Sequence, residues 1–322
     1  MRRDEAARGR GIDVRELPSG VTLRPASVDD APAASRTVSV ALDDLYARQG
    51  RDVPEEHADH DAVYRHLAAD EAASFWVAEA QEGVVGFSVA WRRSDLWFLA
   101  GLFVLPAWQG LGLGQALLKR AQDNRPPDGL AAVLSSASNE LSNRLYARRG
   151  MPPLLPVLQL TGALPLRGAG LPPGLAVRRL SRGDRDLGSL SGIDSVVLGI
   201  DRTVDHRWLL DEERRDGWLF ARRGRPVAYV YLGGDGTEGG AVIGPAAALR
   251  GADLAPVVTF ALAELAAHGA TEGGVMVAGP NLGVQRLLWD AGFQFHGATG
   301  LLGASRPFGR LDRYVFAGNA LM

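Results

Sequence analysis

The sequence predicts an α/β protein made of two similar units, each a mixed, largely antiparallel sheet flanked by helices. An apolar strand over residues 96–104 runs into a glycine-rich turn that opens an amphipathic helix. Strand and helix patterns then follow in the same order twice along the chain, and short motifs recur at a nearly constant spacing. A mixed sheet with helices on both faces buries such a set of elements.

Composition limits the classes of function. The 322 residues suffice for about two domains. With 22% charged residues and a formal net charge of −2, the chain offers no basic surface for nucleic acid or an anionic membrane. It contains no cysteine, which excludes disulfides, thiolate nucleophiles and zinc–sulfur sites. We find no apolar run of about 18 residues and no signal-like apolar core, so we expect a cytoplasmic protein with a flexible arm over 1–20.

The repeat rests on positions that share a residue type and a context. These are Trp76 with Trp218, Val85 with Val227, and Asn139 with Asn281, all 142 apart (218 − 76, 227 − 85, 281 − 139). Near the start of each copy, similar segments place Arg24 and Arg178 154 apart (178 − 24). Two copies of this length indicate duplicated domains. We predict one domain over 21–162, a Gly- and Pro-rich linker over 163–174, and a second domain over 175–322.

Hydrophobic periodicity gives both copies the same order of elements. In the first copy, Pro54 suits the first turn of a helix, and Gln81-Glu82-Gly83 forms a turn between two strands. We expect strands there at 21–25, 74–80, 84–92, 96–104, 129–135 and 154–160, and helices at 28–48, 55–70, 112–124 and 139–149. In the second copy we expect strands at 175–179, 217–222, 226–232, 239–243, 272–277, 293–302 and 311–317, and helices at 183–198, 204–213, 252–268 and 281–290.

The turn after the strand at 96–104 is the most informative segment. It reads Gln109-Gly110-Leu111-Gly112-Leu113-Gly114-Gln115. A helix N-terminus offers backbone N–H groups and partial positive charge, and glycines without Cβ let phosphate oxygens approach the main chain. A dinucleotide-binding fold would need an acidic residue at the end of the next strand, where this chain has Ser135-Ser136. The turn therefore predicts a pyrophosphate cradle of another kind.

A second motif begins 30 residues later (139 − 109), with Asn139, Tyr146, Gly150 and Met151. The glycine turn, with Val104 and Pro106 before it and this motif after it, resembles the GNAT superfamily of N-acetyltransferases. That superfamily carries [Gln/Arg]-x-x-Gly-x-[Gly/Ala] followed by Asn-x6-Tyr-x3-Gly-[Phe/Met]. The resemblance extends over about residues 21–318 and implies two tandem GNAT-like domains.

The resemblance implies acetyl-CoA as co-substrate and no metal. Its contacts would be Leu102, Phe103, Val104, Gln109, Gly110, Leu111, Gly112, Leu113, Gly114 and Gln115, with Asn139 on the pantetheine arm. A backbone N–H of the strand would polarise the thioester carbonyl, as an oxyanion hole does. Tyr146 stands where the superfamily places the acid that protonates the leaving thiolate, and a phenol pKa near ~10 suits that thiolate.

No motif identifies the base that deprotonates the incoming amine. The segment that usually covers the acceptor site carries Asp43, Asp44, Glu55, Glu56, His57 and His60. Among these we favour Glu55 and Glu56, against the alternative that they are the solvated start of a helix.

The second copy departs from the pattern. We match its cradle to Arg250-Gly251-Ala252-Asp253-Leu254-Ala255, with two residues inserted between Pro245 and Arg250 relative to Pro106 and Gln109. Asp253 then replaces the central glycine, where its charge would repel a pyrophosphate. Leu288 takes the place of the tyrosine (281 + 7). We therefore expect a degenerate domain that covers the acceptor, shapes specificity or supports a homodimer.

We predict transfer of acetyl from acetyl-CoA to a primary amine of a small molecule, directly within a ternary complex. The lack of cysteine leaves no cysteinyl acyl-enzyme route. Two alternatives stay open: a mycothiol-synthase-like tandem acetyltransferase, and a non-catalytic acyl-CoA-binding sensor or scaffold. We expect no nucleic-acid or membrane partner.

Overall fold

The computed structural model describes residues 17–53, 60–70, 73–164, 170–233 and 241–322. The N-terminal half comprises β1 (Thr22–Pro25), α1 (Ala31–Arg48), α2 (Asp61–Ala69), β2 (Ala73–Ala80), β3 (Gly83–Arg93), β4 (Leu96–Val104), α3 (Leu113–Ala121), β5 (Leu130–Ser136), α4 (Glu140–Arg148) and β6 (Pro153–Ala163). The C-terminal half comprises β7 (Leu175–Arg179), α5 (Leu187–Val197), α6 (Thr203–Arg207) with a π-helical turn over Trp208–Glu212, β8 (Asp216–Arg222), β9 (Arg225–Gly233), β10 (Ala241–Ala248), α7 (Gly251–Ala267), β11 (Glu272–Ala278), α8 (Leu282–Asp290), β12 (Gln294–Phe295), β13 (Gly300–Ala304) and β14 (Tyr314–Phe316).

These elements confirm the expected α/β class and the order of elements in both copies. The strands expected at 96–104 and 175–179 have those bounds in the structure. The strand expected at 293–302 is two short strands, β12 and β13. The arm expected at 1–20 lies mostly outside the described residues, as do the first part of the helix expected at 55–70 and part of the linker expected at 163–174.

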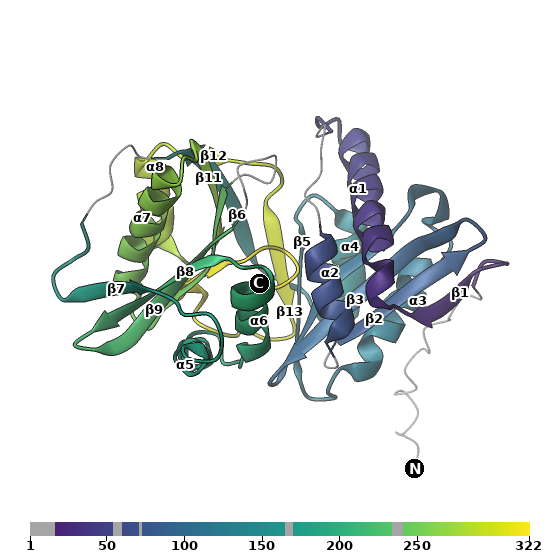
Figure 1. Ribbon diagram of the computed structural model, residues 1–322. Coiled ribbons are helices and arrows are strands. Elements are labelled where there is room, and N and C mark those ends of the chain that lie inside the picture. Colours follow the sequence, from purple (N-terminus) through teal and green to yellow (C-terminus); the bar gives the residue numbers. More distant parts are fainter. Residues whose placement is uncertain (1–16, 54–59, 71–72, 165–169, 234–240) are drawn as a thin grey trace, which may run out of the picture.

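Both halves share one continuous sheet. Its strand order is β1-β2-β3-β4-β5-β13-β6-β11-β14-β10-β9-β8-β7, with β12 also paired to β6. Most neighbours are antiparallel, and the β4–β5 and β10–β11 pairs are parallel. Figure 1 shows the yellow strand β13 standing beside β5 of the N-terminal half, with β6 running beside β11 of the C-terminal half.

The two halves exchange equivalent strands. Adding the repeat spacing of 142 to the bounds of β6 gives 295–305, which is the region of β12 and β13. Yet β6 pairs with β11, from Val157 opposite Ala278 to Ala163 opposite Glu272. In return, β13 pairs with β5, from Gly300 opposite Ser136 to Ala304 opposite Ala132. The boundary between domains at 162–175 stays a prediction, but each half needs a strand from the other.

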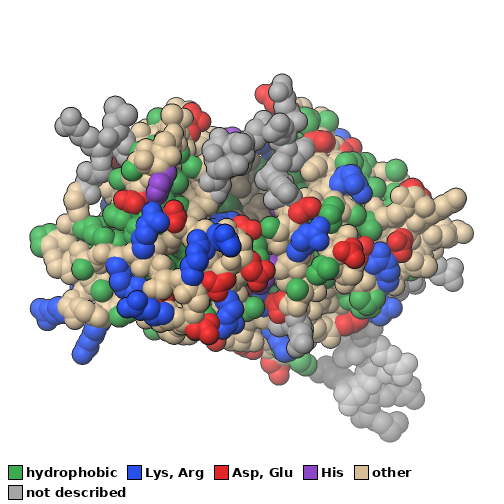
Figure 2. Space-filling view, in the orientation of Figure 1, with side chains coloured by type: hydrophobic (Ala, Val, Ile, Leu, Met, Phe, Trp, Pro, Cys, Tyr) green, Lys and Arg blue, Asp and Glu red, His purple; other side chains and the backbone are tan. Residues whose placement is uncertain are grey.

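Helices cover both faces of the sheet. In the N-terminal half α1 and α2 pack on one face, and α3 lies on the other with Tyr146 of α4 beside it. The largest apolar core cluster includes residues from both halves, such as Trp91 on β3 and Trp208 after α6. No helix in the described ranges combines the length and apolar character needed to cross a membrane. On the face seen in Figure 2, acidic and basic side chains are interspersed.

The repeat is also visible in one ionic contact. Arg24 in β1 donates two hydrogen bonds to Asp30. The backbone N–H of Ser27 donates to the same carboxylate at 2.8 Å. In the second half Arg178 makes the same two-pronged contact with Asp186. The backbone N–H of Ser181 again donates to that carboxylate at 2.8 Å. Both contacts tie the first strand of a copy to its first helix.

Candidate active site

The glycine turn connects β4 to α3 in an unusual backbone conformation. Gly110 and Gly112 have φ values of +79° and +92°, a region that side chains with Cβ rarely adopt. Gly112 is the N-cap of α3, so the turn ends directly at the helix N-terminus. Leu113 is buried in the core, whereas Leu111 on the other side of Gly112 is 46% exposed. The side chains therefore leave the main chain of the turn accessible.

Five successive backbone N–H groups of this turn, from Gly110 to Gly114, have no hydrogen-bond acceptor in the described part of the chain. The N–H of Gln115 is the first that is engaged, with the carbonyl of Gly112 at 3.1 Å. A row of unpaired N–H groups at a helix start is an anion site. Of the residues that the sequence assigned here, Gln115 can therefore contribute its side chain more readily than its N–H.

Beside the turn, the parallel strands β4 and β5 separate. They pair only from Leu96 opposite Leu130 to Leu99 opposite Val133. Beyond these positions β5 pairs with β13 on its far side, and no described strand lies between β5 and the residues 100–104 of β4. Leu102, Phe103 and Val104 thus border a gap in the strand pairing, here called the slot, where an extended chain can bind as an added strand.

In the C-terminal half the equivalent slot is filled by the protein itself. Strands β10 and β11 pair only over Ala241–Ile243. Where they separate, β14 lies between them, with Val315 opposite Ala246 on one side and Val277 on the other. An extended ligand in this slot would have to displace residues 314–316, which are buried.

The structure corrects our alignment of the second cradle. Ala228 of β9 lies opposite Ala248, as Gly86 of β3 lies opposite Val104. The first pair of positions differs by 142 (228 − 86) and the second by 144 (248 − 104), so Val104 corresponds to Ala248. Pro245, which we had matched to Pro106, lies inside β10. Only residues 249 and 250 then separate β10 from α7, against residues 105–112 between β4 and α3.

Asp253 is consequently not the counterpart of a cradle glycine. It lies in the first turn of α7, is 2% exposed, and accepts from Arg222 at 2.7 Å. Leu288, at the tyrosine position, is fully buried. Asn281 caps α8 through the N–H of Val284, just as Asn139 caps α4 through the N–H of Ser142. The helix start is therefore kept in both halves, while the turn and the tyrosine are not.

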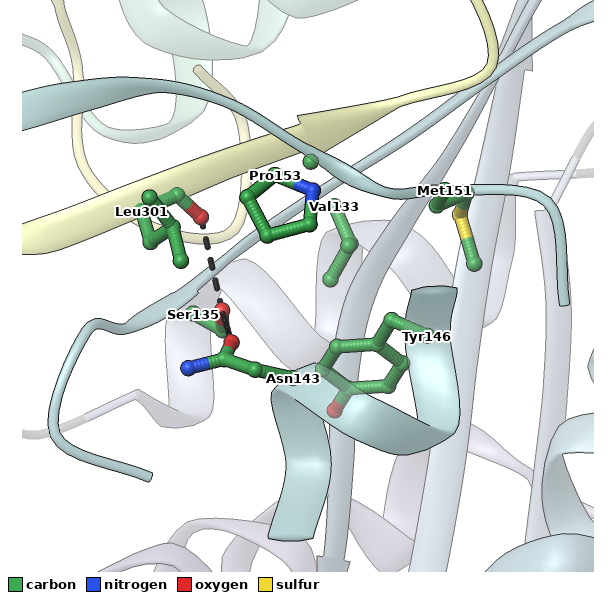
Figure 3. A pocket seen from close by; sticks show the side chains of 8 residues that line it. Val133, Ser135, Asn143, Tyr146, Met151, Pro153 and Leu301 are labelled. Carbon is green, nitrogen blue, oxygen red and sulfur yellow. Dashed lines mark hydrogen bonds between the residues drawn. The ribbon is translucent and has the colours of Figure 1, made fainter. Parts of the chain in front are cut away.

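Tyr146 lies on α4, on the same side of the sheet as α3. Figure 3 shows its ring beside Val133, Met151 and Pro153. The ring is 6% exposed, and this burial raises the pKa of Tyr146 to about 12, although a hydrogen bond with Ser142 opposes the shift. The phenol therefore stays protonated throughout the neutral range. We assigned the acid role because an ordinary phenol and the leaving thiolate have similar pKa values, near ~10. In the free protein the pKa of Tyr146 lies above that value.

Sequence reasoning missed a polar group next to Tyr146. The hydroxyl of Ser135 on β5 donates to Oδ1 of Asn143 at 2.6 Å and lies 3.4 Å from the carbonyl oxygen of Leu301 (Figure 3). The side-chain amide of Asn143 donates to the carbonyl of Ser136 at 3.0 Å. Since Leu301 lies on β13, the C-terminal half forms one wall of the pocket beside Tyr146. Only the exchange of strands brings it there, and no motif reports that exchange.

The side chain of Gln109 contacts other parts of the protein, while its expected contact with the co-substrate stays a prediction. Its Nε2 donates to the carbonyl of Val104 at 2.9 Å, and its Oε1 accepts from Arg48 at 3.2 Å. Arg48 is the last residue of α1, and the next residue, Gln49, donates to the carbonyl of Ser138 at 3.2 Å. The end of α1 therefore contacts both the β4 turn and the loop after β5.

Only some of the candidate general bases lie among the residues that the structure describes. Glu55, Glu56 and His57 lie outside the described residues. Asp44 is described and forms an ion pair of 2.5 Å with Arg48. Within the described residues no group of three or more His, Cys, Asp or Glu is arranged to hold a metal ion.

A groove of about 670 Å³ opens in front of the glycine turn. One wall consists of Gly110, Gly112, Gly114 and Gln115. The opposite wall is α4 and the residue after it, through Leu141, Arg144, Leu145, Arg148 and Arg149. All charged residues of this lining are arginines. The spacing of 141, 144, 145 and 148 is the signal that could have predicted one helix face.

Comparisons with known proteins agree with this architecture. Residues 71–150 match the model of an acetyltransferase (GNAT) domain. No curated protein matches in sequence. Among solved structures, a candidate acetyltransferase from Pyrococcus horikoshii is similar, with a TM-score of 0.68, 14% identity, and 95% of this chain and 98% of that chain covered.

Two further solved structures are similar along nearly their whole length. A GCN5-related N-acetyltransferase from Sphaerobacter thermophilus has a TM-score of 0.63 and 20% identity, with 92% of this chain and 100% of that chain covered. A tandem GNAT protein from the clavulanic acid biosynthesis pathway has a TM-score of 0.56 and 15% identity, with 89% and 99% covered. Residues 71–150 of the chain therefore match an acetyltransferase (GNAT) domain, and the chain as a whole has the fold of these solved structures.

Proposed function

We propose that this protein transfers acetyl from acetyl-CoA to a primary amine of a small molecule, at a single site in the N-terminal half. The acetyltransferase (GNAT) domain at 71–150 indicates acyl-CoA-dependent acetyl transfer. The observation that carries the proposal is the gap in strand pairing between β4 and β5, next to five backbone N–H groups that have no acceptor among the described residues. A pyrophosphate on those N–H groups places an extended pantetheine arm along β4.

The residues of this chain then have distinct tasks. Acetyl-CoA supplies the acetyl group as a thioester. Backbone N–H groups at residues 102–104 polarise its carbonyl oxygen as negative charge develops there. Tyr146 donates a hydrogen bond to the departing sulfur and gives up its proton as the thiolate leaves. The amine attacks the thioester carbonyl directly within a ternary complex, because the chain has no cysteine to carry the acyl group. The C–S bond breaks as the amide forms, and the proton that the amine nitrogen loses goes to a base, for which Glu55 and Glu56 are our candidates.

We infer that the C-terminal half is degenerate as an acetyltransferase. Three features of that half support this inference: β14 fills the slot, two residues replace the long glycine turn, and Leu288 stands at the tyrosine position. Its role is then structural, since it supplies β13, the strand that pairs with β5 beside Tyr146. A mycothiol-synthase-like enzyme with two working sites does not agree with this arrangement.

Calorimetry and a turnover assay on the full chain test the proposal. We expect one CoA bound per chain, and thiol release from acetyl-CoA with at least one member of a panel of polyamines, aminoglycosides, amino acids and peptides. Released CoA is detected with a reagent that reacts with thiols. The protein itself contributes no signal to this assay, because it lacks cysteine. Binding without release for the whole panel would favour the sensor alternative. Two CoA per chain would refute the single site, and no binding would refute the assignment of the slot.

A further inference from the structure

We propose that Arg144 and Arg148 on α4 form a second anion site that binds the 3′-phosphate of coenzyme A, so that the protein discriminates CoA from 3′-dephospho-CoA. The inference rests on the proposed function, because it assumes that the glycine turn holds the pyrophosphate. It adds which side chains select the nucleotide end of the co-substrate.

The first argument is the geometry of the groove. Arg144 and Arg148 are four residues apart on α4, so they lie on one face of the helix. Both line the groove of about 670 Å³ whose other wall carries Gly110, Gly112 and Gly114. An anion held by the glycine turn therefore faces the two guanidinium groups across the groove.

The second argument is the unbalanced charge. Arg144 and Arg148 are exposed, and neither forms a hydrogen bond or ion pair with any residue that the structure describes. Two like charges at this spacing on a helix repel each other, and Glu140, four residues before Arg144, forms no ion pair with it in the described structure. Arg149, also in the lining, is instead held by Gln122 at 3.3 Å. Among the described residues that line the groove, Arg144 and Arg148 are thus the arginines available to a further phosphate.

The third argument is the apolar surface between them. Leu141, which is 65% exposed, and Leu145 share the helix face with Arg144 and Arg148. An exposed leucine inside a cationic groove suits a ligand with both apolar and anionic parts. The nucleotide end of CoA has an adenine ring, a pyrophosphate and a 3′-phosphate. Guanidinium groups bind phosphate through paired, charge-assisted hydrogen bonds.

The test compares two probes on the full chain by calorimetry. Wild-type protein should bind CoA about 10- to 100-fold more tightly than 3′-dephospho-CoA, the range expected for charge-assisted bonds to one phosphate. In the double variant Arg144→Gln/Arg148→Gln this ratio should fall to near one, because only CoA loses contacts to a 3′-phosphate, whereas any weakening through the pyrophosphate is common to both probes. Arg36→Gln, an exposed arginine on α1, is the matched control and should keep the ratio.

The outcomes distinguish failure of the 3′-phosphate site from failure of the proposed function. Equal affinity of wild-type protein for both probes, or an unchanged ratio in the double variant, would overturn the 3′-phosphate site and leave the proposed function standing. Failure of the wild-type protein to bind either probe would overturn the proposed function as well. Retained binding of 3′-dephospho-CoA by the double variant also shows that the variant is folded.

Discussion

Asp205 of α6 accepts hydrogen bonds from two nitrogens of Arg93 of β3, at 2.6 and 3.2 Å, and thereby joins the two halves of the molecule. The side chains of Asp205 and Arg93 are 0% and 4% exposed. Arg202 and His66 also contact the same carboxylate, at 3.3 Å each. Burial alone would raise the pKa of Asp205, but the hydrogen bond from His66 and the charges of Arg93 and Arg202 hold it well below its usual value.

We therefore expect Asp205→Asn to lower the free energy of unfolding by about 3–5 kcal/mol, because it removes the carboxylate that Arg93 and Arg202 share and leaves each of these buried arginines with one acidic partner, Asp70 and Asp194 respectively. The pKa of Asp205 is lower in the folded state, so its contribution is present above the unfolded value of about 4 and is lost as the pH falls below it. Urea unfolding at pH 7 and pH 3 measures both effects. The difference between variant and wild type should shrink at pH 3.

The matched control for Asp205→Asn is Asp95→Asn. Asp95 also pairs across the halves, with Arg306 at 2.8 Å, but both side chains are more than half exposed. Its removal should cost about 0–1 kcal/mol. Equal losses for the two variants would contradict the importance we assign to the buried network.

Tyr146→Phe should lower kcat by about 100-fold and change the Kd for CoA much less, since the role we propose for the hydroxyl is to protonate the departing sulfur. Because burial raises the pKa of Tyr146 to about 12, ionisation of this phenol should not lower kcat at any pH below about 11. Initial rates and calorimetry check the two quantities. Tyr64→Phe is the control, because it removes the hydroxyl of another buried tyrosine, whose ring packs against Phe75 and Phe87. Wild-type turnover in Tyr146→Phe would exclude the acid role.

Gly112→Asp should weaken CoA binding by at least about 100-fold, since it places a carboxylate among the N–H groups of the turn. Part of any stability loss will come from the φ of +92°. Gly224→Asp controls for this, because Gly224 has a φ of +73° and open space around it in the other half. Calorimetry with CoA should show lost binding in the first variant and wild-type binding in the second.

Gly303→Ala tests the exchanged strand. A Cβ on Gly303 would lie 2.8 Å from the carbonyl oxygen of Met151, so β13 must shift against the segment that packs on Tyr146. We expect a loss of about 1–3 kcal/mol in stability and a lower kcat. Gly188→Ala in α5 has open space and should be neutral or stabilising. Wild-type stability and turnover in Gly303→Ala would mean that β13 does not position the site.

Local patterns in the sequence determined much of this protein. Local hydrophobic patterns predicted strands such as β4, a continuous apolar run, and β7. Asn139 and Asn281 marked equivalent helix starts, because caps and hydrophobic patterns act within a few residues. The glycines of the turn likewise predicted a main chain that phosphate oxygens can approach, and the structure adds that Gly110 and Gly112 have positive φ. The match of residues 71–150 to a GNAT domain follows from these local features.

Only the tertiary structure decided which strands are neighbours. β6 and β13 have similar patterns, and either can pair with β5 or β11, since pairing energy depends on contacts between residues more than 100 positions apart. The same holds for β14 in the second slot, for Leu301 beside Tyr146, and for Arg144 and Arg148 across from the glycine turn. Each of these depends on the packing of segments that are distant in sequence, and no local pattern encodes such packing.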